Sequence, residues 1–595
     1  MQVPKPGEAL PTDPKTIRDV KKRLRTPSIT FKHLCVDPFT LEDHHWDLSS
    51  REVLGAVREL DSLNSTLELH LNPDANNEAL GDVFHACVRT LWPTLLLWLD
   101  FLHPRHHKGT ERIERVPLQT LSNVMHAFCR AEGPTAVLRA HTSPFYRLLY
   151  LLWLRFDEYC TKSTDVARCL DKLGRAVRLT VDVAAAEQVA GPVAQSSTSI
   201  APSFPHCLPS ALYAARNRPR QLYRQALTQV NALLKFFVAF PHDTTPYDAL
   251  QTQIGAIGQF ANAVLPLNVH ARDVIRSLVH ILRVLCSFPA GYYLCGGVVY
   301  ALHVMWRTCS DGRSIAWALD EGVLPLMIEL RQKELEASDK KTIADALRVL
   351  AENTYRRRVL RALCSGGRTG SFHGAGFASQ DTLLAIDKWV QHRNDLMRRA
   401  YSKACALPKC GAEPNATLKK CPCLSVCYCS AECQRADWKK HKKHCKIERD
   451  AMAYTRILSA TDLEKMPFEE AHFICLCARD YVSTHAQAVV ESVKQAIANS
   501  PPTRDAPVIT IMINAARLLG THRVYVDEQR SQDSTSDGIS RRGALRFKDP
   551  TLVLREPSIL VIAHQEDMIL HAMGTTLQGL EDLALVARQA RSRRK

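Results

Sequence analysis

The sequence predicts a mainly α-helical chain: a helical superhelix or bundle, then a small cysteine-rich module, then a small α+β region. Three observations lead to this prediction. From about Arg51 to Ala400, apolar residues recur at three- and four-residue steps, and strand-like alternation is nearly absent. Eight cysteines crowd into the 41 residues from Cys405 to Cys445. After Lys446, helical patterns give way to short apolar runs rich in β-branched residues.

Length and composition indicate a folded protein of several parts. The 595 residues are 46% hydrophobic and 23% charged, which excludes a disordered or collagen-like chain. We expect a flexible N-terminal segment at 1–30, a helical repeat-like scaffold at 31–400, the cysteine-rich module at 401–446, and an α+β region with a basic tail at 447–595. The net charge of +16 is compatible with nucleic acid or acidic partners, but Lys and Arg on solvated helix faces are the simpler explanation.

The scaffold is predicted from successive amphipathic segments. Turn signals such as Phe240-Pro241 and Leu265-Pro266 separate them, so the helices are of ordinary length with short connections. The clearest helical periods cover Leu227–Phe240, Ile254–Leu265, Val274–Cys286, Val298–Trp306 and Ile343–Leu350.

The most apolar segment, Val83–Leu102, is predicted to be a buried helix of a soluble protein. A membrane span needs about 20 nearly uninterrupted apolar residues, whereas His85, Arg89, Pro93 and Asp100 interrupt this one. The first 16 residues contain four prolines and no apolar run, so they show no secretory signal. We therefore expect no membrane span and an intracellular, reducing compartment, cytoplasmic or nuclear.

A stretch late in the scaffold begins a helix in a recognisable way. Gly322 makes a turn, and Pro325 follows in the first turn of an amphipathic helix through Leu330, where its missing N–H has no intrahelical partner to lose. The stretch resembles the start of the third helix of an armadillo repeat. The resemblance covers one repeat's worth of residues, and no steady period surrounds it. It implies an armadillo-like superhelix, with a helical bundle as the broader alternative.

Two segments inside the array are predicted to be linkers. Gly191–Ser210 is rich in Pro, Ser and Ala, and Ser365–Gln380 carries five glycines. The second has neither the Gly-Lys-Ser/Thr of a phosphate loop nor a complete dinucleotide fingerprint, so it is not predicted to bind nucleotides.

The C-terminal region is predicted to be a small α+β module. Helical patterns cover Leu463–Tyr481 and Ala488–Asn499, and strand-like runs cover Ala506–Ile513, Val524–Val526 and Ile559–Ile562. A solvated basic tail, Arg588–Lys595, is expected to follow.

The cysteine-rich module is predicted to bind metal. An even spread of the 20 cysteines would place one or two in this window. Without a secretory signal, such a cluster with nearby histidines indicates metal rather than disulfides. His441 and Cys445 are four apart and share one helix face, as do Cys429 and Cys433, with Ser430 placed to cap a helix beginning between the latter two.

Two further pairs complete the donor set. Cys421 and Cys423 are separated by one residue, so in an extended segment both side chains point to the same side. Cys405 and Cys410 bracket a Leu-Pro turn. Seven cysteines and one histidine then provide eight donors, enough for two tetrahedral sites.

These residues resemble the MYND-type zinc finger, over about 41 of the 595 residues. The matching residues are the donor pairs together with Tyr428, Ser430, Glu432, Gln434, Trp438 and Lys442. The resemblance implies that the pairs interleave. One zinc would be held by Cys405, Cys410, Cys429 and Cys433, and the other by Cys421, Cys423, His441 and Cys445.

Two spacings depart from the family pattern. The second pair has one residue between its cysteines where the family usually has two, and the first pair has four where two is commoner. Cys427 and His444 are spare donors. Cys427 is the alternative ligand if the short Cys421–Cys423 segment cannot bring both of its sulfurs to the second zinc.

Zinc bound by this module is expected to be structural. Eight protein donors leave no coordination position for water, and a segment this short has too little core to fold without a staple. Two zinc ions with seven thiolates and a neutral histidine sum to −3, which ten Lys and Arg against three Asp and Glu in residues 401–446 offset.

The resemblance implies a docking site for short, often proline-containing peptides. The helix that forms part of the groove in the family carries Gln434 and Trp438 here, although Trp438 is equally suited to covering the zinc site as core. We therefore predict a non-enzymatic, zinc-binding adaptor that docks a peptide of a partner protein. The oligomeric state is not readable from the sequence.

Two other classes were weighed. Some proteins with this finger resemble SET-type lysine methyltransferases, but neither the Asn-His-x-Cys motif nor the glycine-rich cofactor stretch of that family is present. A nucleic-acid-binding regulator is supported only by the bulk charge and the basic tail, so nucleic acid is an unlikely partner.

Overall fold

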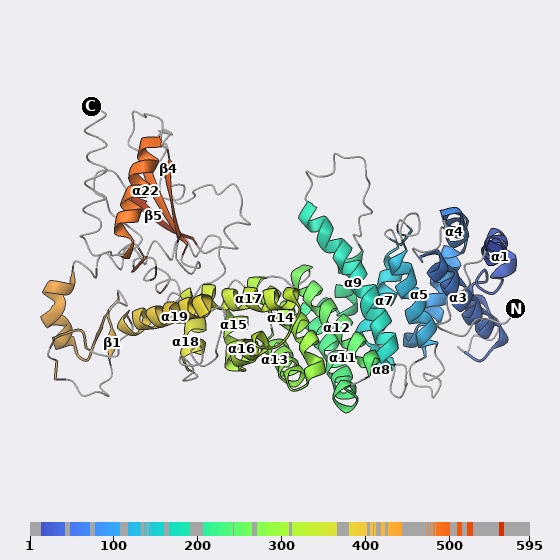
Figure 1. The fold of residues 1–595 in the computed structure, drawn as a ribbon, viewed down its shortest axis with the longest axis horizontal. Coiled ribbons are helices and arrows are strands. Elements are labelled where there is room, and N and C mark those ends of the chain that lie inside the picture. Colours follow the sequence, from blue (N-terminus) through green and yellow to red (C-terminus); the bar gives the residue numbers. More distant parts are fainter. Residues whose placement is uncertain are drawn as a thin grey trace. The chain divides into compact units, whose positions relative to one another are not determined.

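A computed structural model describes most of the chain before residue 446 and the elements of a smaller part after it (Figure 1). The described residues are 14–41, 48–71, 78–107, 117–131, 136, 138–139, 142–159, 166–190, 206–241, 243–263, 271–308, 312–365, 380–400, 405–408, 410–411, 418–422, 426–442, 445, 473, 477, 480–481, 484–499, 508–514, 521–527 and 558–563. They divide into two compact units, residues 1–308 with 326–343 and residues 309–325 with 344–595.

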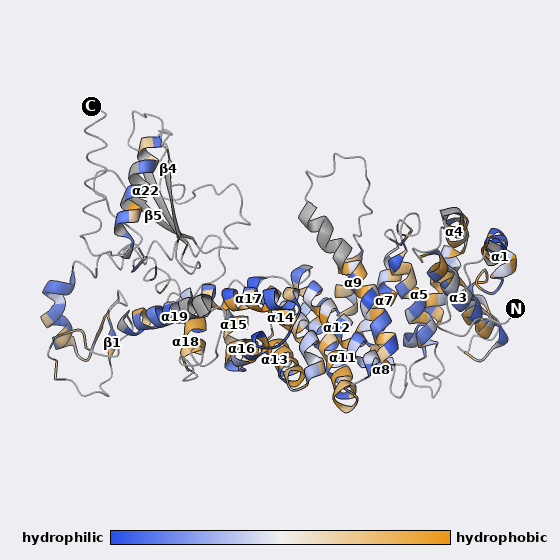
Figure 2. Cartoon of the chain, viewed as in Figure 1, coloured by the Kyte–Doolittle hydropathy of each residue, from blue (hydrophilic) through white to orange (hydrophobic). Residues whose placement is uncertain are grey.

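The first unit is a succession of helices that pack against near neighbours in the chain. Its helices are α1 (Pro14–Arg25), α2 (Pro27–Thr30), α3 (Arg51–His70), α4 (Glu78–Phe101), α5 (Leu118–Arg130), α7 (Ser143–Leu154), α8 (Phe156–Tyr159), α9 (Val166–Ala190), α10 (Cys207–Ala214), α11 (Pro219–Ala239), α12 (Thr244–Ala263), α13 (Arg272–Cys286) and α14 (Tyr292–Thr308). Apolar and polar residues alternate around them, as helices buried on one side require (Figure 2).

The predicted helical periods are confirmed. Four of the five segments lie largely within α11, α12, α13 and α14, and the fifth lies within α17 (Ala337–Glu352). Among the described residues between 51 and 400 there is no strand. The apolar segment that begins at Val83 lies in α4, and no described helix combines the length and hydrophobicity that crossing a bilayer demands.

Of the N-terminal segment expected to be flexible, residues 1–13 lie outside the described residues, and residues 14–30 are largely helical. Helices α1 and α2 occupy residues 14–30, and α1 packs on α4. Val20 and Leu24 are buried, and one helical turn separates them. That short apolar stripe is enough to dock the helix although most of its other residues are charged or polar.

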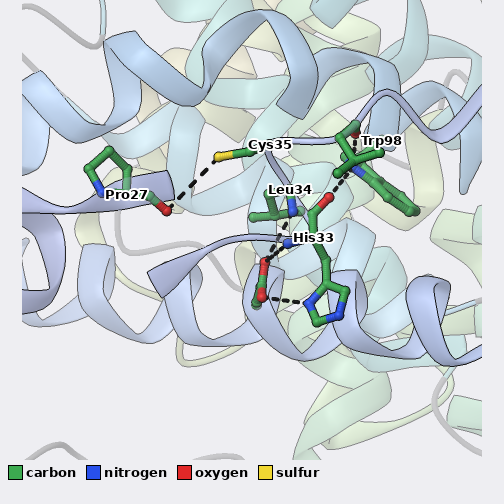
Figure 3. Close-up of polar contacts among 7 residues, drawn as sticks. Pro27, His33, Leu34, Cys35 and Trp98 are labelled. Atoms are coloured by element: carbon green, nitrogen blue, oxygen red, sulfur yellow. Dashed lines mark hydrogen bonds and ion pairs between the residues drawn. The ribbon is translucent and has the colours of Figure 1, made fainter. Parts of the chain in front are cut away.

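A turn between α2 and α3 shows how the N-terminal helices are fixed (Figure 3). The Glu59 carboxylate accepts the backbone N–H groups of His33 and Leu34 at 3.0 and 3.1 Å, and its second oxygen lies 2.7 Å from His33 Nδ1. The Trp98 indole N–H donates to the carbonyls of His33 and Val36 at 3.1 and 2.9 Å. Side chains of α3 and α4 thus supply hydrogen bonds to backbone groups of the turn in addition to the turn's own backbone hydrogen bonds.

The centre of the first unit is built around α9 and α12. Gln253 on α12 accepts from the Trp153 indole N–H at 2.7 Å and donates to the Leu170 carbonyl at 2.7 Å. The Trp153 ring stacks on Phe260 with centroids 5.5 Å apart. Gly174 on α9 lets the two helices approach, since a Cβ there would lie 2.7 Å from Gln253 Nε2.

The second unit begins with short helices and continues into the cysteine-rich module. Helix α15 (Arg313–Asp320) packs on α18 (Arg357–Ser365), which also contacts α19 (Gln380–Ala400). Gly322 has φ 85°, a left-handed conformation that favours glycine, and α16 (Val323–Arg331) starts directly after it with Pro325 in its first turn. The helix start predicted at this place is therefore confirmed.

The C-terminal α+β prediction is also confirmed. Strands β3 (Val508–Asn514), β4 (Thr521–Asp527) and β5 (Ser558–Ala563) form an antiparallel sheet in the order β4-β3-β5, in which Ile511 is paired with both Val524 and Val561. Helix α22 (Ala486–Asn499) contacts β4. Most of the helix predicted at Leu463–Tyr481 and the whole tail lie outside the described residues.

The two predicted linkers lie largely outside the described residues, at 191–205 and 366–379. The end of the first is not a linker, because α10 begins at Cys207. Cys207 itself is buried beneath Tyr150, whose hydroxyl lies 2.7 Å from its sulfur. This packing draws the last residues of a Pro- and Ser-rich segment into the core.

Candidate metal centre

The backbone of the module brings three separate segments together. Strands β1 (Lys419–Lys420) and β2 (Cys427–Tyr428) form an antiparallel pair in which Lys420 faces Cys427. Cys405 forms a parallel bridge to Cys427, and the Ala406 N–H donates to the Cys427 carbonyl at 2.8 Å. Strand β2 therefore lies between the first and second cysteine pairs and leads directly into the third.

A helix over residues 431–442 supplies the last donors. The Ser430 hydroxyl accepts the N–H of Cys433 at 3.3 Å, which is the N-cap expected from the sequence. Cys433 lies in the first turn, and His441, eight residues later, lies on the same face near the end. The helix thus has one candidate ligand at each of its two ends.

The first donor cluster consists of four cysteines. The sulfurs of Cys405, Cys410, Cys429 and Cys433 all lie within 4.8 Å of one another. Cys410 Sγ is 3.3 Å from Cys429 Sγ and 3.5 Å from Cys433 Sγ, and the last two are 3.4 Å apart. All four residues are half-buried.

The second cluster is buried. Cys421 Sγ lies 3.4 Å from His441 Nε2 and 3.6 Å from Cys445 Sγ. Cys423 lies outside the described residues. Cys427, considered from the sequence as a substitute, belongs to neither cluster. The donors therefore interleave along the chain in the order that the resemblance implies.

The donor chemistry fits zinc. Zn–S bonds of about 2.3 Å in a tetrahedron place sulfurs roughly 3.8 Å apart, and replacing one sulfur with an imidazole nitrogen shortens the separation to about 3.6 Å. The separations of 3.3–3.6 Å here are close to these values, so small shifts complete the coordination geometry. Thiolate and imidazole donors with no carboxylate also match zinc rather than calcium or magnesium.

The thiols of the module differ in acidity. Partial burial raises the pKa of Cys405, but hydrogen bonds from the backbone N–H groups of Cys429 and Leu407 and from neighbouring thiols outweigh burial and lower the pKa to about 7. Burial raises the pKa of Cys427, although the charge of Lys420 opposes the rise. Hydrogen bonds with Cys410 and Cys433 raise the pKa of Cys429 to about 12, so in the absence of metal the thiolate of the first cluster is favoured at Cys405.

A small core joins the two clusters around Tyr428, a residue that matches the MYND pattern but for which the sequence predicted no role. Tyr428 is buried with Cys421 and Cys445, its hydroxyl donates to Asp437 Oδ2 at 2.7 Å, and its ring meets His441 edge-on with centroids 6.2 Å apart. The sequence did hold a signal for this role, because Tyr428 is an aromatic residue directly before the metal-ligand candidate Cys429.

The two residues predicted to contact a partner lie on the 431–442 helix. Trp438 is 40% exposed, and its ring meets His441 edge-on with centroids 6.2 Å apart. Gln434 is half-buried, and its N–H donates to the Ser430 carbonyl at 3.2 Å. Trp438 covers one side of the second cluster while a large part of its indole faces solvent.

The sequence model of the MYND finger family matches residues 405–445. This segment is a MYND finger. MYND fingers bind zinc and are protein–protein interaction modules rather than catalytic domains.

Among solved structures, the crystal structure of an engineered protein from the Northeast Structural Genomics Consortium aligns with 64% of this chain and 94% of its own, at 13% identity and a TM-score of 0.27. A likeness at that score supports no statement about this fold.

Proposed function

We propose that the protein is a zinc-dependent adaptor, in which a helical, armadillo-like scaffold carries a two-zinc MYND finger that docks a short peptide of a partner protein. The observation that carries the proposal is the placement of Trp438. It lies 40% exposed on a helix whose two ends reach two different donor clusters.

The first zinc in this proposal is held by four thiolates, and the second by three thiolates and the His441 imidazole, with Cys423 as the remaining donor. Both sites have a full set of protein donors, so the ions shape the finger and activate no water. Because Cys433 and His441 belong to different clusters, the two ions fix both the position and the rotation of the 431–442 helix.

The docking surface therefore depends on metal. A helix of 12 residues is marginal in water by itself, and the buried core of the finger consists of Tyr428 with two of the cysteines. Without zinc, the Trp438 ring loses the edge contact with His441 that orients it. A proline-containing peptide suits an exposed indole, because a flat aromatic ring packs against a pyrrolidine ring with little loss of entropy. A reducing, intracellular compartment would keep the thiols available for zinc.

The test is a selection of 12-residue peptides, displayed at random, on the full-length zinc-loaded protein. We expect a related set of peptides to be enriched on the wild type and on Tyr213→Ala, which removes a 52% exposed aromatic residue from the scaffold. The set should be lost on Trp438→Ala, with two zinc ions retained by mass spectrometry. If no peptide set is enriched, or the same set is enriched on Trp438→Ala, the proposed docking site is wrong.

A further inference from the structure

The outer face of the finger helix carries a stripe of positive charge around Trp438. Arg435, Trp438, Lys439 and Lys442 are spaced at i, i+3, i+4 and i+7, so they lie on one face of the helix. All four are exposed, and Arg435 has 76% of its side chain in solvent. In Figure 2, this helix, beside β1, is largely hydrophilic. We call Arg435, Lys439 and Lys442 the basic stripe.

Little negative charge lies near the basic stripe on the described surface of the finger. The described residues from 405 to 442 contain six cations, Lys419, Lys420, Arg435, Lys439, Lys440 and Lys442, and two carboxylates. Of the two carboxylates, Asp437 is half-buried and accepts the Tyr428 hydroxyl, whereas Glu432 pairs with Arg435 at 2.9 Å. The surface beside Trp438 is therefore cationic.

Neutralising the metal clusters is the alternative role for these cations. The proposed clusters carry a net −3, but their donors lie on the inner face with Cys433 and His441, whereas the basic stripe lies on the outer face. Long, solvated side chains on that face gain little from charges behind the helix, since water screens them. An exposed aromatic ring flanked by cations instead suits a ligand with an apolar residue next to acidic ones.

We infer that the peptide bound by the finger is acidic, with Asp or Glu next to the apolar residue that contacts Trp438. This inference rests on the proposed docking function. From residue 435 to residue 442 the helix rises about 10 Å, the length of roughly three extended residues. The acidic stretch is therefore short, about two carboxylates within three or four residues of the apolar one. A nucleic acid is less well matched, since a basic surface about 10 Å long meets few phosphates.

The experiment repeats the peptide selection on full-length Lys439→Glu/Lys442→Glu. Lys340→Glu/Lys341→Glu is the matched control, because it changes the charge equally at two exposed lysines on α17. We expect Asp and Glu to be enriched near the apolar positions on the wild type and the control, and Lys and Arg to replace them on the finger variant. A synthetic peptide from the wild-type set should bind the finger variant about tenfold more weakly, and its affinity for the wild type should fall between 50 and 300 mM salt.

Three results would overturn the inference. Selected peptides that need Trp438 but show no acidic enrichment would leave docking intact and remove the acidic partner. Loss of zinc from the finger variant would assign the cations to the metal clusters. Tighter binding of a 20-nucleotide single strand than of the peptide, abolished in the finger variant, would point to nucleic acid. Enrichment of no peptide at all would instead refute the proposed function itself.

Discussion

The assignment of the first zinc site can be tested by replacing one sulfur in it and one beside it. Cys433→Ser removes a sulfur that lies 3.5 Å from Cys410 Sγ and 3.4 Å from Cys429 Sγ. Cys427→Ser is the matched control, because Cys427 is half-buried in the same finger but belongs to neither donor cluster. The two variants differ only in whether the lost sulfur faces the other donors.

The size of the effect follows from the donor count. Zinc binding by small finger peptides releases roughly 10 kcal/mol or more at neutral pH, and an even share among four donors gives about 2.5 kcal/mol each. That corresponds to about 70-fold weaker binding at the first site. Cys433 also lies in the first turn of the 431–442 helix, so losing this zinc releases the N-terminal end of that helix.

Native mass spectrometry of the full-length protein, repeated across a chelator titration, measures the result. We expect two zinc ions in the wild type and in Cys427→Ser, and one in Cys433→Ser at chelator concentrations that leave the wild type loaded. The far-ultraviolet circular dichroism should fall only slightly, because 12 helical residues are affected in a chain whose α4 alone has 24. Two ions retained by Cys433→Ser, one ion lost from Cys427→Ser, or a parallel loss of helix throughout the scaffold would refute the reasoning.

Three further predictions concern the scaffold. Burial, reinforced by nearby Lys and Arg, lowers the pKa of His126 to about 3. The full stability is therefore present above the ordinary pKa of 6.5 and is lost as the pH falls from 6.5 towards 3. The expected loss at pH 5 is about 2 kcal/mol. Urea unfolding at pH 7.5 and 5 should show a smaller pH effect in His126→Asn, and an unchanged effect would contradict this burial. Gly174→Ala should cost about 1–3 kcal/mol in the same assay, because the added Cβ meets Gln253 Nε2 at 2.7 Å, and a neutral result would show that the helices can separate. Glu59→Ala removes the one oxygen that accepts the N–H groups of both His33 and Leu34, so we expect a loss of about 1.5–3 kcal/mol, whereas unchanged stability would show that water can replace the carboxylate.

Much of the fold was predictable because each prediction rested on local patterning. The apolar periods of α11–α14 and α17, the glycine and proline that start α16, and the strands β3 to β5 lie where the sequence indicated them. The helical N-terminal part was not expected, because its burial depends on α4, about 60 residues away in the chain. Cys207 was likewise predicted to lie in a linker. Its burial could not be predicted, because it depends on contact with Tyr150, which is far away in the sequence.

The sequence by itself determined that a thiol-rich module with the spacing of a MYND finger follows a helical scaffold, because ligand spacing and helical period are both properties of neighbouring residues. Only the tertiary structure decided that the described donors fall into two interleaved groups, that Cys427 stands apart from both, and that Tyr428 joins them. It also decided that Trp438 both touches His441 and faces solvent, which spacing on a helix left open. The physical reason is that coordination and burial depend on distances between segments far apart in the chain, and these distances exist only once the strands and the helix have packed together.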